Sequence, residues 1–199
     1  QYNVNGNFFN KDEINDILSF CKKNGESFSY NPNETWDCKR IYDEEFKQKI
    51  LSKFIENIKS NNFDLWFDFE TFDLKNFNIS LTSYYDGRYL NLHKDKTSEL
   101  TTVIVLSDDF EGGQFVLTDD ENPPYNFETL DGLIISDLKL GDSISFNGSK
   151  TFHGVLPVTK GTRYALNIWM TETDFDYPKL KNNKTLLWEL LLFVMPAVG

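Results

Sequence analysis

The chain has 199 residues, a formal net charge of −11 and many aromatic side chains, among them 18 phenylalanines. This length suits one domain with a sizeable core. Nucleic-acid binders usually carry a basic stripe that neutralises phosphates, and the sequence shows none, so no nucleic-acid partner is expected. An acidic surface would attract a basic peptide, although such charge more often serves solubility alone.

The cysteines and the apolar runs indicate the cellular compartment. Cys21 and Cys38 form neither a CxxC pair nor a disulfide framework, and two reduced thiols are typical of a reducing compartment. No signal-peptide pattern is visible, and no apolar run reaches the about 20 residues of a transmembrane helix. We therefore expect a cytoplasmic (intracellular) protein without a membrane partner.

The first third of the chain predicts two helices. Residues 8–23 carry an apolar stripe at helical spacing, with Asn10 and Glu13 in the pattern of a capping box. Residues 26–42 indicate a strand and a loop. A second apolar stripe predicts a helix from about Glu44 to Ile58. Two such helices need a surface to pack on, and we expect later sheets to supply it.

From Phe63 the apolar period changes from 3.6 to 2, which predicts strands. The alternation is clear in Trp66–Phe72 and in Phe77–Thr82. Later strands are expected near residues 100–106, 113–118, 133–136, 142–146, 152–156 and 162–170. Short strands separated by Gly, Asp and Asn turns are typical of a jelly roll or a sandwich. We therefore expect a mainly β fold with flanking helices (α+β).

Two segments fit neither period. Residues 119–132 contain Pro123-Pro124 and several acids, and a loop of this length over a barrel mouth is often a lid or a binding loop. Residues 186–195 are apolar nearly all round, and they would cover the domain's own sheet, dock on a neighbour or form a dimer contact. We expect a single domain over residues 1–199, with helical support at about 8–60, a core at about 63–172 and an apolar tail at 180–199.

The two histidines of the chain, His93 and His153, carry the chemistry. His93 and Asp95 are two positions apart, so on an extended strand both side chains point to one face. With a third ligand they would occupy one side of an octahedron. This is the 2-His-1-carboxylate arrangement of non-heme Fe(II) oxygenases, which leaves positions open for co-substrate and oxygen. We predict that His153 is the third ligand.

Arg163 follows in an otherwise apolar, alternating strand. Burial of an unpaired cation is costly, so this side chain needs an anionic partner. A planar guanidinium fits a carboxylate in a two-pronged pairing. An iron site with a fixed arginine nearby therefore predicts a dicarboxylate co-substrate, which would chelate the metal at one end and pair with Arg163 at the other.

Five motifs follow one another between residues 77 and 172. They are Tyr-Tyr-x-Gly…His-x-Asp from Tyr84, Gly-Gly-x-Phe from Gly112, Gly-Asp-x-x-x-Phe from Gly141, His-x-Val-x-Pro-Val from His153 and Gly-x-Arg-Tyr-x-Leu-x-x-Trp from Gly161. Each motif alone is weak, but in this order and at these separations they make a strong signal. In them the sequence resembles the Fe(II)/2-oxoglutarate-dependent dioxygenases, and among these the prolyl 4-hydroxylase-like branch.

The resemblance implies a double-stranded β-helix (jelly-roll) core packed against N-terminal helices. It implies Fe(II) on the two histidines and Asp95, which would be the catalytic and metal-binding residues, and Arg163 on the distal carboxylate of 2-oxoglutarate. Tyr85 matches a family tyrosine whose hydroxyl reaches the co-substrate, with a plain core or turn tyrosine as the alternative. Trp169 matches a substrate-lining position, with a core tryptophan as the alternative. Some relatives add a tyrosine on the strand after His-x-Asp; here we consider Thr102 as a substitute.

The resemblance further implies a dioxygenase that uses Fe(II), O2 and 2-oxoglutarate, with ascorbate as a possible addition. It would hydroxylate an unactivated C–H bond, above all in a prolyl residue of a peptide or protein, and release succinate and CO2. Asp95 supports hydroxylation over halogenation, because a smaller residue there would leave room for a halide. The alternatives are a jelly roll that binds a metal or a carboxylate without oxidation, and an oxygenase acting on a small metabolite or a nucleic acid. We expect a peptide or protein partner and a monomer or weak dimer.

Overall fold

The computed structural model of the protein describes residues 2–28, 36–60, 77–95, 97–118, 120, 123 and 134–171. Three of the segments interpreted above lie outside these residues. They are the alternating stretch Trp66–Phe72, nearly all of residues 119–132, and the apolar tail 180–199. In the part that is described, no helix is long and apolar enough to cross a membrane.

Both predicted helices are confirmed, as α1 (Lys11–Asn24) and α2 (Glu44–Ser60). Asn10 caps α1: its side chain accepts hydrogen bonds from the backbone N–H groups of Asp12 and Glu13. The Glu13 carboxylate in turn accepts the N–H of Asn10 at 2.8 Å, so the capping box is complete. The helix begins three residues later than predicted, because Asn10 lies outside it as the cap.

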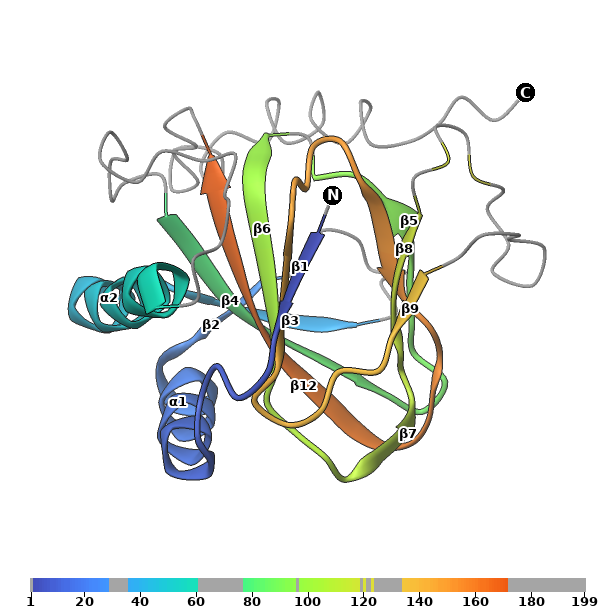
Figure 1. Ribbon diagram of the computed structural model, residues 1–199. Coiled ribbons are helices and arrows are strands. Elements are labelled where there is room, and N and C mark those ends of the chain that lie inside the picture. Colours follow the sequence, from blue (N-terminus) through green and yellow to red (C-terminus); the bar gives the residue numbers. More distant parts are fainter. Residues whose placement is uncertain are drawn as a thin grey trace, which may run out of the picture.

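Strands make up most of the remaining described chain. Their bounds are β1 (Tyr2–Asn5), β2 (Glu26–Phe28), β3 (Asp37–Ile41), β4 (Phe77–Tyr85), β5 (Leu90–His93), β6 (Ser98–Val105), β7 (Phe110–Gly112), β8 (Phe115–Thr118), β9 (Ile134–Ser136), β10 (Ser143–Phe146), β11 (Phe152–Val155) and β12 (Val158–Thr171). They form two antiparallel sheets (Figure 1). The larger has the order β1-β10-β6-β12-β4-β3-β2, with β7 on β12, and the smaller has the order β5-β11-β8-β9. The mainly β fold with N-terminal helices is as predicted.

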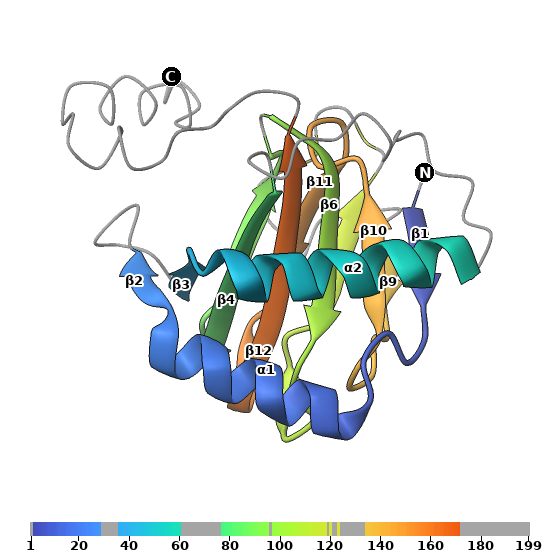
Figure 2. The same cartoon turned by 90° about the vertical axis from the view of Figure 1, so that its left-hand side faces the viewer.

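The larger sheet is covered on both faces. The two helices lie across one face, which we call the outer face (Figure 2). There Phe54 of α2 and Ile168 of β12 belong to one buried core, and full burial of a side chain such as Phe54 contributes about 1.5–3 kcal/mol. The opposite, inner face packs against the smaller sheet, with Phe115 and Phe146 in a second core. Side chains alternate between these two layers along each strand.

β12 is the longest strand and lies at the centre of the larger sheet. It pairs with β4 on one side and with β6 on the other, and its first residues pair with β7. Residues 162–170 were predicted as this strand. The strand extends beyond them in both directions, across Gly161, whose φ of +74° suits glycine. The alternation along β12 fixes which of its side chains enter the inner layer.

Candidate metal and co-substrate site

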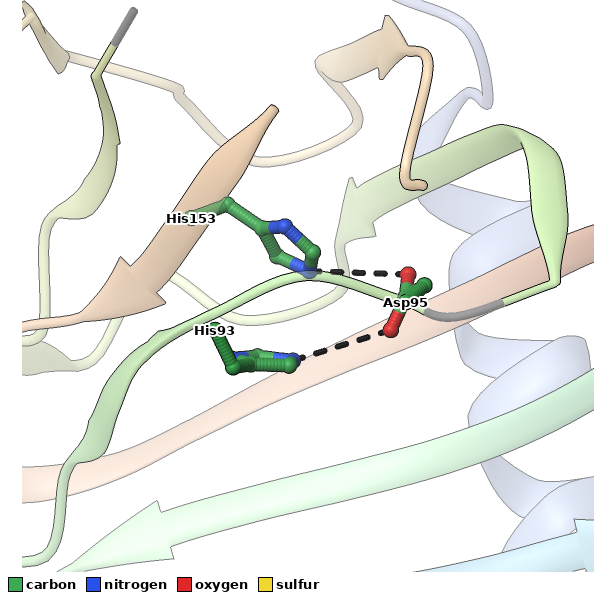
Figure 3. Close-up of side chains that lie close together, drawn as sticks. All are labelled: His93, Asp95 and His153. Atoms are coloured by element: carbon green, nitrogen blue, oxygen red, sulfur yellow. Dashed lines mark ion pairs between the residues drawn. The ribbon is translucent and has the colours of Figure 1, made fainter. Parts of the chain in front are cut away.

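The two histidines and Asp95 converge between the sheets (Figure 3). His93 ends β5, and its direct partner across the β5–β11 ladder is His153. The imidazole ring centroids are 4.2 Å apart. The distance from His93 Nε2 to Asp95 Oδ1 is 3.6 Å, and that from His153 Nε2 to Asp95 Oδ2 is 3.5 Å. One ligand atom from each residue lies within 4.8 Å of the others, a spacing that a single metal ion could bridge.

Backbone carbonyls orient both imidazoles. His93 Nδ1 lies 2.9 Å from the carbonyl oxygen of Asn91, and His153 Nδ1 lies 3.1 Å from that of Thr151. A carbonyl only accepts, so each Nδ1 carries the proton and each Nε2 turns its lone pair to the site. A hydrogen bond at the other ring nitrogen is the usual support of a metal-binding histidine.

The Asp95 carboxylate is held by several groups. Its backbone N–H donates to the carbonyl oxygen of Gly148 at 2.9 Å. Its Oδ2 accepts a hydrogen bond from Thr101 Oγ1 at 2.7 Å and another from Trp169 Nε1 at 3.0 Å. The side chain therefore has a fixed position although it lies just beyond the end of β5.

The protonation states suit a divalent cation. Burial alone would raise the pKa of Asp95, but the imidazoles of His153 and His93 and the Thr101 hydroxyl outweigh it, so this pKa lies below its ordinary value. Burial, aided by the charge of His93, lowers the pKa of His153 to about 4. Burial also opposes charging of His93, yet the Asp95 carboxylate raises the pKa of His93 above its ordinary value. At neutral pH Asp95 is therefore ionised and His153 neutral.

This donor set fits Fe(II). Two neutral imidazole nitrogens and one carboxylate oxygen on one side of an ion are the ligands of the non-heme iron triad. The His153 side chain is 5% exposed and that of His93 is 37% exposed, so the site opens to solvent on the His93 side. Among the described residues, this is the one group of three His, Cys, Asp or Glu side chains that could hold a metal.

Arg163 supplies a buried positive charge on the inner face of β12. It is 2% exposed, and its guanidinium carbon is 5.7 Å from the ring centroid of Tyr84, its partner on β4. Burial lowers the pKa of Arg163, and the Tyr84 hydroxyl opposes this shift. No acidic side chain of the described ranges forms an ion pair with Arg163. A buried guanidinium in this state fits a carboxylate ligand.

Tyr84 connects the two ends of the site. Burial raises the pKa of Tyr84 above its ordinary value, so the hydroxyl is neutral. Its ring lies within electrostatic reach of both the Arg163 guanidinium and the Asp95 carboxylate. Trp36 packs on the same ring, with centroids 6.4 Å apart. A ligand that spans from the metal ligands to Arg163 would therefore pass Tyr84.

The Gly-Gly-x-Phe turn makes room for the arginine. Gly113 has a φ of +65°, in the left-handed region. A Cβ there would lie 3.0 Å from Arg163 Cδ and 2.7 Å from Val158 Cγ2, closer than side chains tolerate. Glycine at position 113 therefore serves two purposes: it allows the positive φ of the turn, and it leaves space for the Arg163 side chain.

Comparisons with known proteins place this site in a family. The profile of the 2OG-Fe(II) oxygenase superfamily matches residues 79–171, which include the triad and Arg163. Over these residues the chain matches the 2OG-Fe(II) oxygenase superfamily. Human prolyl 3-hydroxylase 2 is 36% identical over 74 residues, which are 37% of this chain. The matched part is 10% of the length of that human protein.

Several solved structures share the fold of this chain. A Pseudomonas putida prolyl-4-hydroxylase superimposes with a TM-score of 0.60 at 15% identity, covering 86% of this chain and 92% of that chain. Viral collagen prolyl hydroxylase from Paramecium bursaria Chlorella virus-1 has a TM-score of 0.58 at 21% sequence identity, covering 86% of this chain and 96% of that chain. HygX from Streptomyces hygroscopicus has a TM-score of 0.61 at 12% sequence identity, covering 87% of this chain and 84% of that chain. These likenesses confirm the double-stranded β-helix core.

The oxygenase places Tyr85, the predicted co-substrate tyrosine, away from Arg163. The Tyr85 hydroxyl donates to Asp37 Oδ2 at 2.9 Å, and the Arg88 guanidinium lies 4.0 Å from its ring centroid. Since neighbours on a strand face opposite sides, Tyr84 enters the inner layer and Tyr85 does not. The residues suggested the motif but not which of its two tyrosines faces inward.

Trp169 and Thr102 also differ from expectation in their contacts. Trp169 does reach the site, but its indole N–H is bonded to Asp95. Thr102 is wrong as a pocket residue, because it faces outward and its hydroxyl pairs with Ser145 Oγ at 2.8 Å. Its neighbour Thr101, which was not singled out, contacts the carboxylate instead. The sequence held no signal for Thr101, because Asp95 lies before β6 and strand alternation does not relate the two residues.

Proposed function

We propose that this oxygenase hydroxylates an unactivated C–H bond, with a prolyl residue of a peptide or protein as its substrate. The observation that carries the proposal is the pairing of a complete triad with a buried arginine on the inner surface of one jelly roll. The three ligands suit Fe(II), and Arg163 suits the distal carboxylate of 2-oxoglutarate. Asp95 as a ligand favours hydroxylation over halogenation.

Each part of the site has a task in this scheme. When bound, Fe(II) and 2-oxoglutarate supply the activation of O2, with decarboxylation to succinate and CO2. His93, Asp95 and His153 would hold the metal from one side, so that the opposite side faces co-substrate and substrate. Arg163 would orient the co-substrate by a two-pronged pairing, with the Tyr84 hydroxyl as a further donor. The apolar inner core beside His153, including Phe115 and Phe146, would keep water from the reacting atoms.

A prolyl substrate is supported by the relatives and by charge. Several similar structures are prolyl hydroxylases, and so is the human relative. The net charge of −11 favours encounter with a basic peptide. We also propose that ascorbate sustains turnover. A peptide would reach the metal from the His93 side, where the triad is exposed.

A small-molecule substrate is the second candidate. HygX, whose structure was solved with nickel, 2-oxoglutarate and hygromycin B bound, is as similar in fold as the prolyl hydroxylases, with a TM-score of 0.61. Fold similarity at 13% identity does not choose between a peptide and a metabolite. The reaction at the metal would be the same in both cases.

The test is a mass-spectrometric screen of proline-containing peptide libraries for products with one added oxygen atom. Reactions contain Fe(II) and ascorbate, with and without 2-oxoglutarate, and His153→Ala serves as the inactive control. We expect an oxidised proline that depends on 2-oxoglutarate and on His153. Succinate formation that only small molecules stimulate would overturn the prolyl assignment. Absence of both iron binding and succinate would overturn the oxygenase activity and leave a binding module.

A further inference from the structure

One oxygen of the Asp95 carboxylate, Oδ2, accepts hydrogen bonds from two neutral donors on different strands. Thr101 Oγ1 of β6 donates at 2.7 Å and Trp169 Nε1 of β12 donates at 3.0 Å. Thr101 and Trp169 are direct partners in the β6–β12 ladder, so their side chains reach the carboxylate as an adjacent pair. We propose that Trp169 and Thr101 are positioning residues that occupy Oδ2 and leave Oδ1 to the metal.

The two donors use both hydrogen-bond acceptor positions of Oδ2. A carboxylate oxygen offers two lone-pair directions, and the hydroxyl and the indole N–H take one each. The Thr101 hydroxyl also lies 3.0 Å from Ser98 Oγ. Because Asp95 can only accept, the single Thr101 proton is directed to the carboxylate, while the Ser98 hydroxyl donates to the carbonyl oxygen of Leu100 at 3.0 Å. Among the described residues no side chain donates a hydrogen bond to Asp95 Oδ1, and the His93 Nε2 lone pair lies 3.6 Å from it.

The indole is itself held in place from its face. The Arg40 guanidinium carbon lies 4.8 Å from the Trp169 ring centroid, within cation–π range. Arg40 belongs to β3 and pairs with Ser80 of β4. A ring held on its face by one strand keeps its N–H edge directed at the carboxylate. β3 is thereby connected to the metal site through a single tryptophan.

The turn at Gly148 closes the same corner. Its carbonyl oxygen accepts the Asp95 N–H, and a Cβ on Gly148 would collide with Thr101 Oγ1 and lie 2.9 Å from Asp95 Oδ2. The carboxylate therefore has contacts from the backbone, from a hydroxyl and from an indole. Loss of one Oδ2 donor frees that oxygen to turn toward the ion, so that the carboxylate would bind through both oxygens or lose its fixed orientation.

The consequence is measurable on metal binding alone. Loss of a hydrogen-bond partner that orients a metal ligand typically costs about 10–100-fold in affinity. The inference rests on the proposed metal centre, but titration without 2-oxoglutarate separates it from turnover. If the parent binds no metal, the proposed function fails. If parent and variants bind metal equally, only this inference fails.

The experiment uses the full 199-residue chain and Mn(II) or Co(II) in the absence of 2-oxoglutarate. Trp169→Phe removes the N–H but keeps a ring for Arg40, and Thr101→Val removes the hydroxyl at nearly constant volume. Thr102→Val is the matched control, because the same substitution one position along alters a hydroxyl that contacts Ser145 on the outer face. Calorimetry gives the Mn(II) affinity, and the visible absorption of the Co(II) form reports the coordination geometry.

We expect Trp169→Phe and Thr101→Val each to weaken Mn(II) binding about tenfold or more and to change the Co(II) spectrum. We expect Thr101→Ser, which keeps the hydroxyl, and Thr102→Val to behave like the parent. If Trp169→Phe does not fold, the three threonine variants still decide. Parent-like affinity and spectrum in Thr101→Val would overturn the proposal, and so would an equal loss in Thr102→Val.

Discussion

The two faces of the larger sheet differ in what they do although they use the same strands. On the inner face Tyr84 lies beside Arg163, and Thr101 donates to Asp95. One residue along the chain, Tyr85 bonds to Asp37 and Thr102 bonds to Ser145, both away from the site. A step of one residue on a strand therefore separates a side chain of the site from one that supports the fold.

The largest effect expected from this comparison concerns the metal ligands. Asp95→Ala removes an inner-face carboxylate, whereas Asp37→Ala removes one that bonds Tyr85 and Arg88 on the outside. Loss of a residue that hydrogen-bonds a metal ligand lowers metal affinity by up to roughly 100-fold. We predict that Asp95→Ala, which removes a ligand itself, weakens Mn(II) binding by more than that. Asp37→Ala should bind Mn(II) as the parent does. Calorimetric titration measures both, and equal losses would refute the division between the faces.

The next effect concerns the Arg163 end of the inner face. Arg163→Met should raise the KM for 2-oxoglutarate by at least about 100-fold, since each of the two hydrogen bonds to a charged group contributes about 1.5–3 kcal/mol. The same variant should raise the Tm of the ligand-free protein, because it removes a buried cation that no described acidic side chain pairs with. Weaker binding of 2-oxoglutarate together with a more stable ligand-free protein is the result expected for a charge that serves ligand binding. An unchanged KM would contradict this assignment.

Acidification should weaken metal binding through His93. The Asp95 carboxylate raises the pKa of His93 above its ordinary value, and a metal needs the neutral ring. The Mn(II) affinity should therefore fall as the pH drops through that pKa, by up to about tenfold per pH unit for one released proton. His153, with a pKa of about 4, stays neutral in this range and adds no second proton. Titrations from about pH 6 to pH 8 measure the slope, and a flat profile would refute the prediction.

The smallest effect separates two adjacent tyrosines. Tyr84→Phe should raise the KM for 2-oxoglutarate by up to about tenfold, since one neutral hydrogen bond contributes about 0.5–1.5 kcal/mol. Tyr85→Phe loses its bond to Asp37 and should leave this KM unchanged. Steady-state assays of succinate formation compare the two variants. A larger effect at Tyr85 would reverse the assignment of the two faces.

The sequence alone identified the features that depend on local spacing. Helical periodicity and the Asn10 cap gave the helices, and the His-x-Asp spacing identified His93 and Asp95 as ligands of one site, although Asp95 lies just beyond the end of β5. His153 followed because the chain has no other histidine. These inferences needed no knowledge of which strands pair.

The inward tyrosine and threonine could not be predicted, because both faces of their strands are buried. Apart from Glu99, β6 carries only apolar or hydroxyl-bearing side chains, and it is covered by helices and by the smaller sheet, so no regular polar alternation marks its inner face. Tyr84 is selected only by its register opposite Arg163. The short strands β1 and β7 were not predicted.

The central claim is that the inner face holds a metal and an oxo-dicarboxylate side by side. Anomalous diffraction from crystals grown without oxygen, with Fe(II) and 2-oxoglutarate, tests it most directly. We predict an iron peak bound by His93 Nε2, His153 Nε2 and Asp95 Oδ1, with the far carboxylate of 2-oxoglutarate on the Arg163 guanidinium. Iron bound elsewhere, or a carboxylate remote from Arg163, would contradict the account.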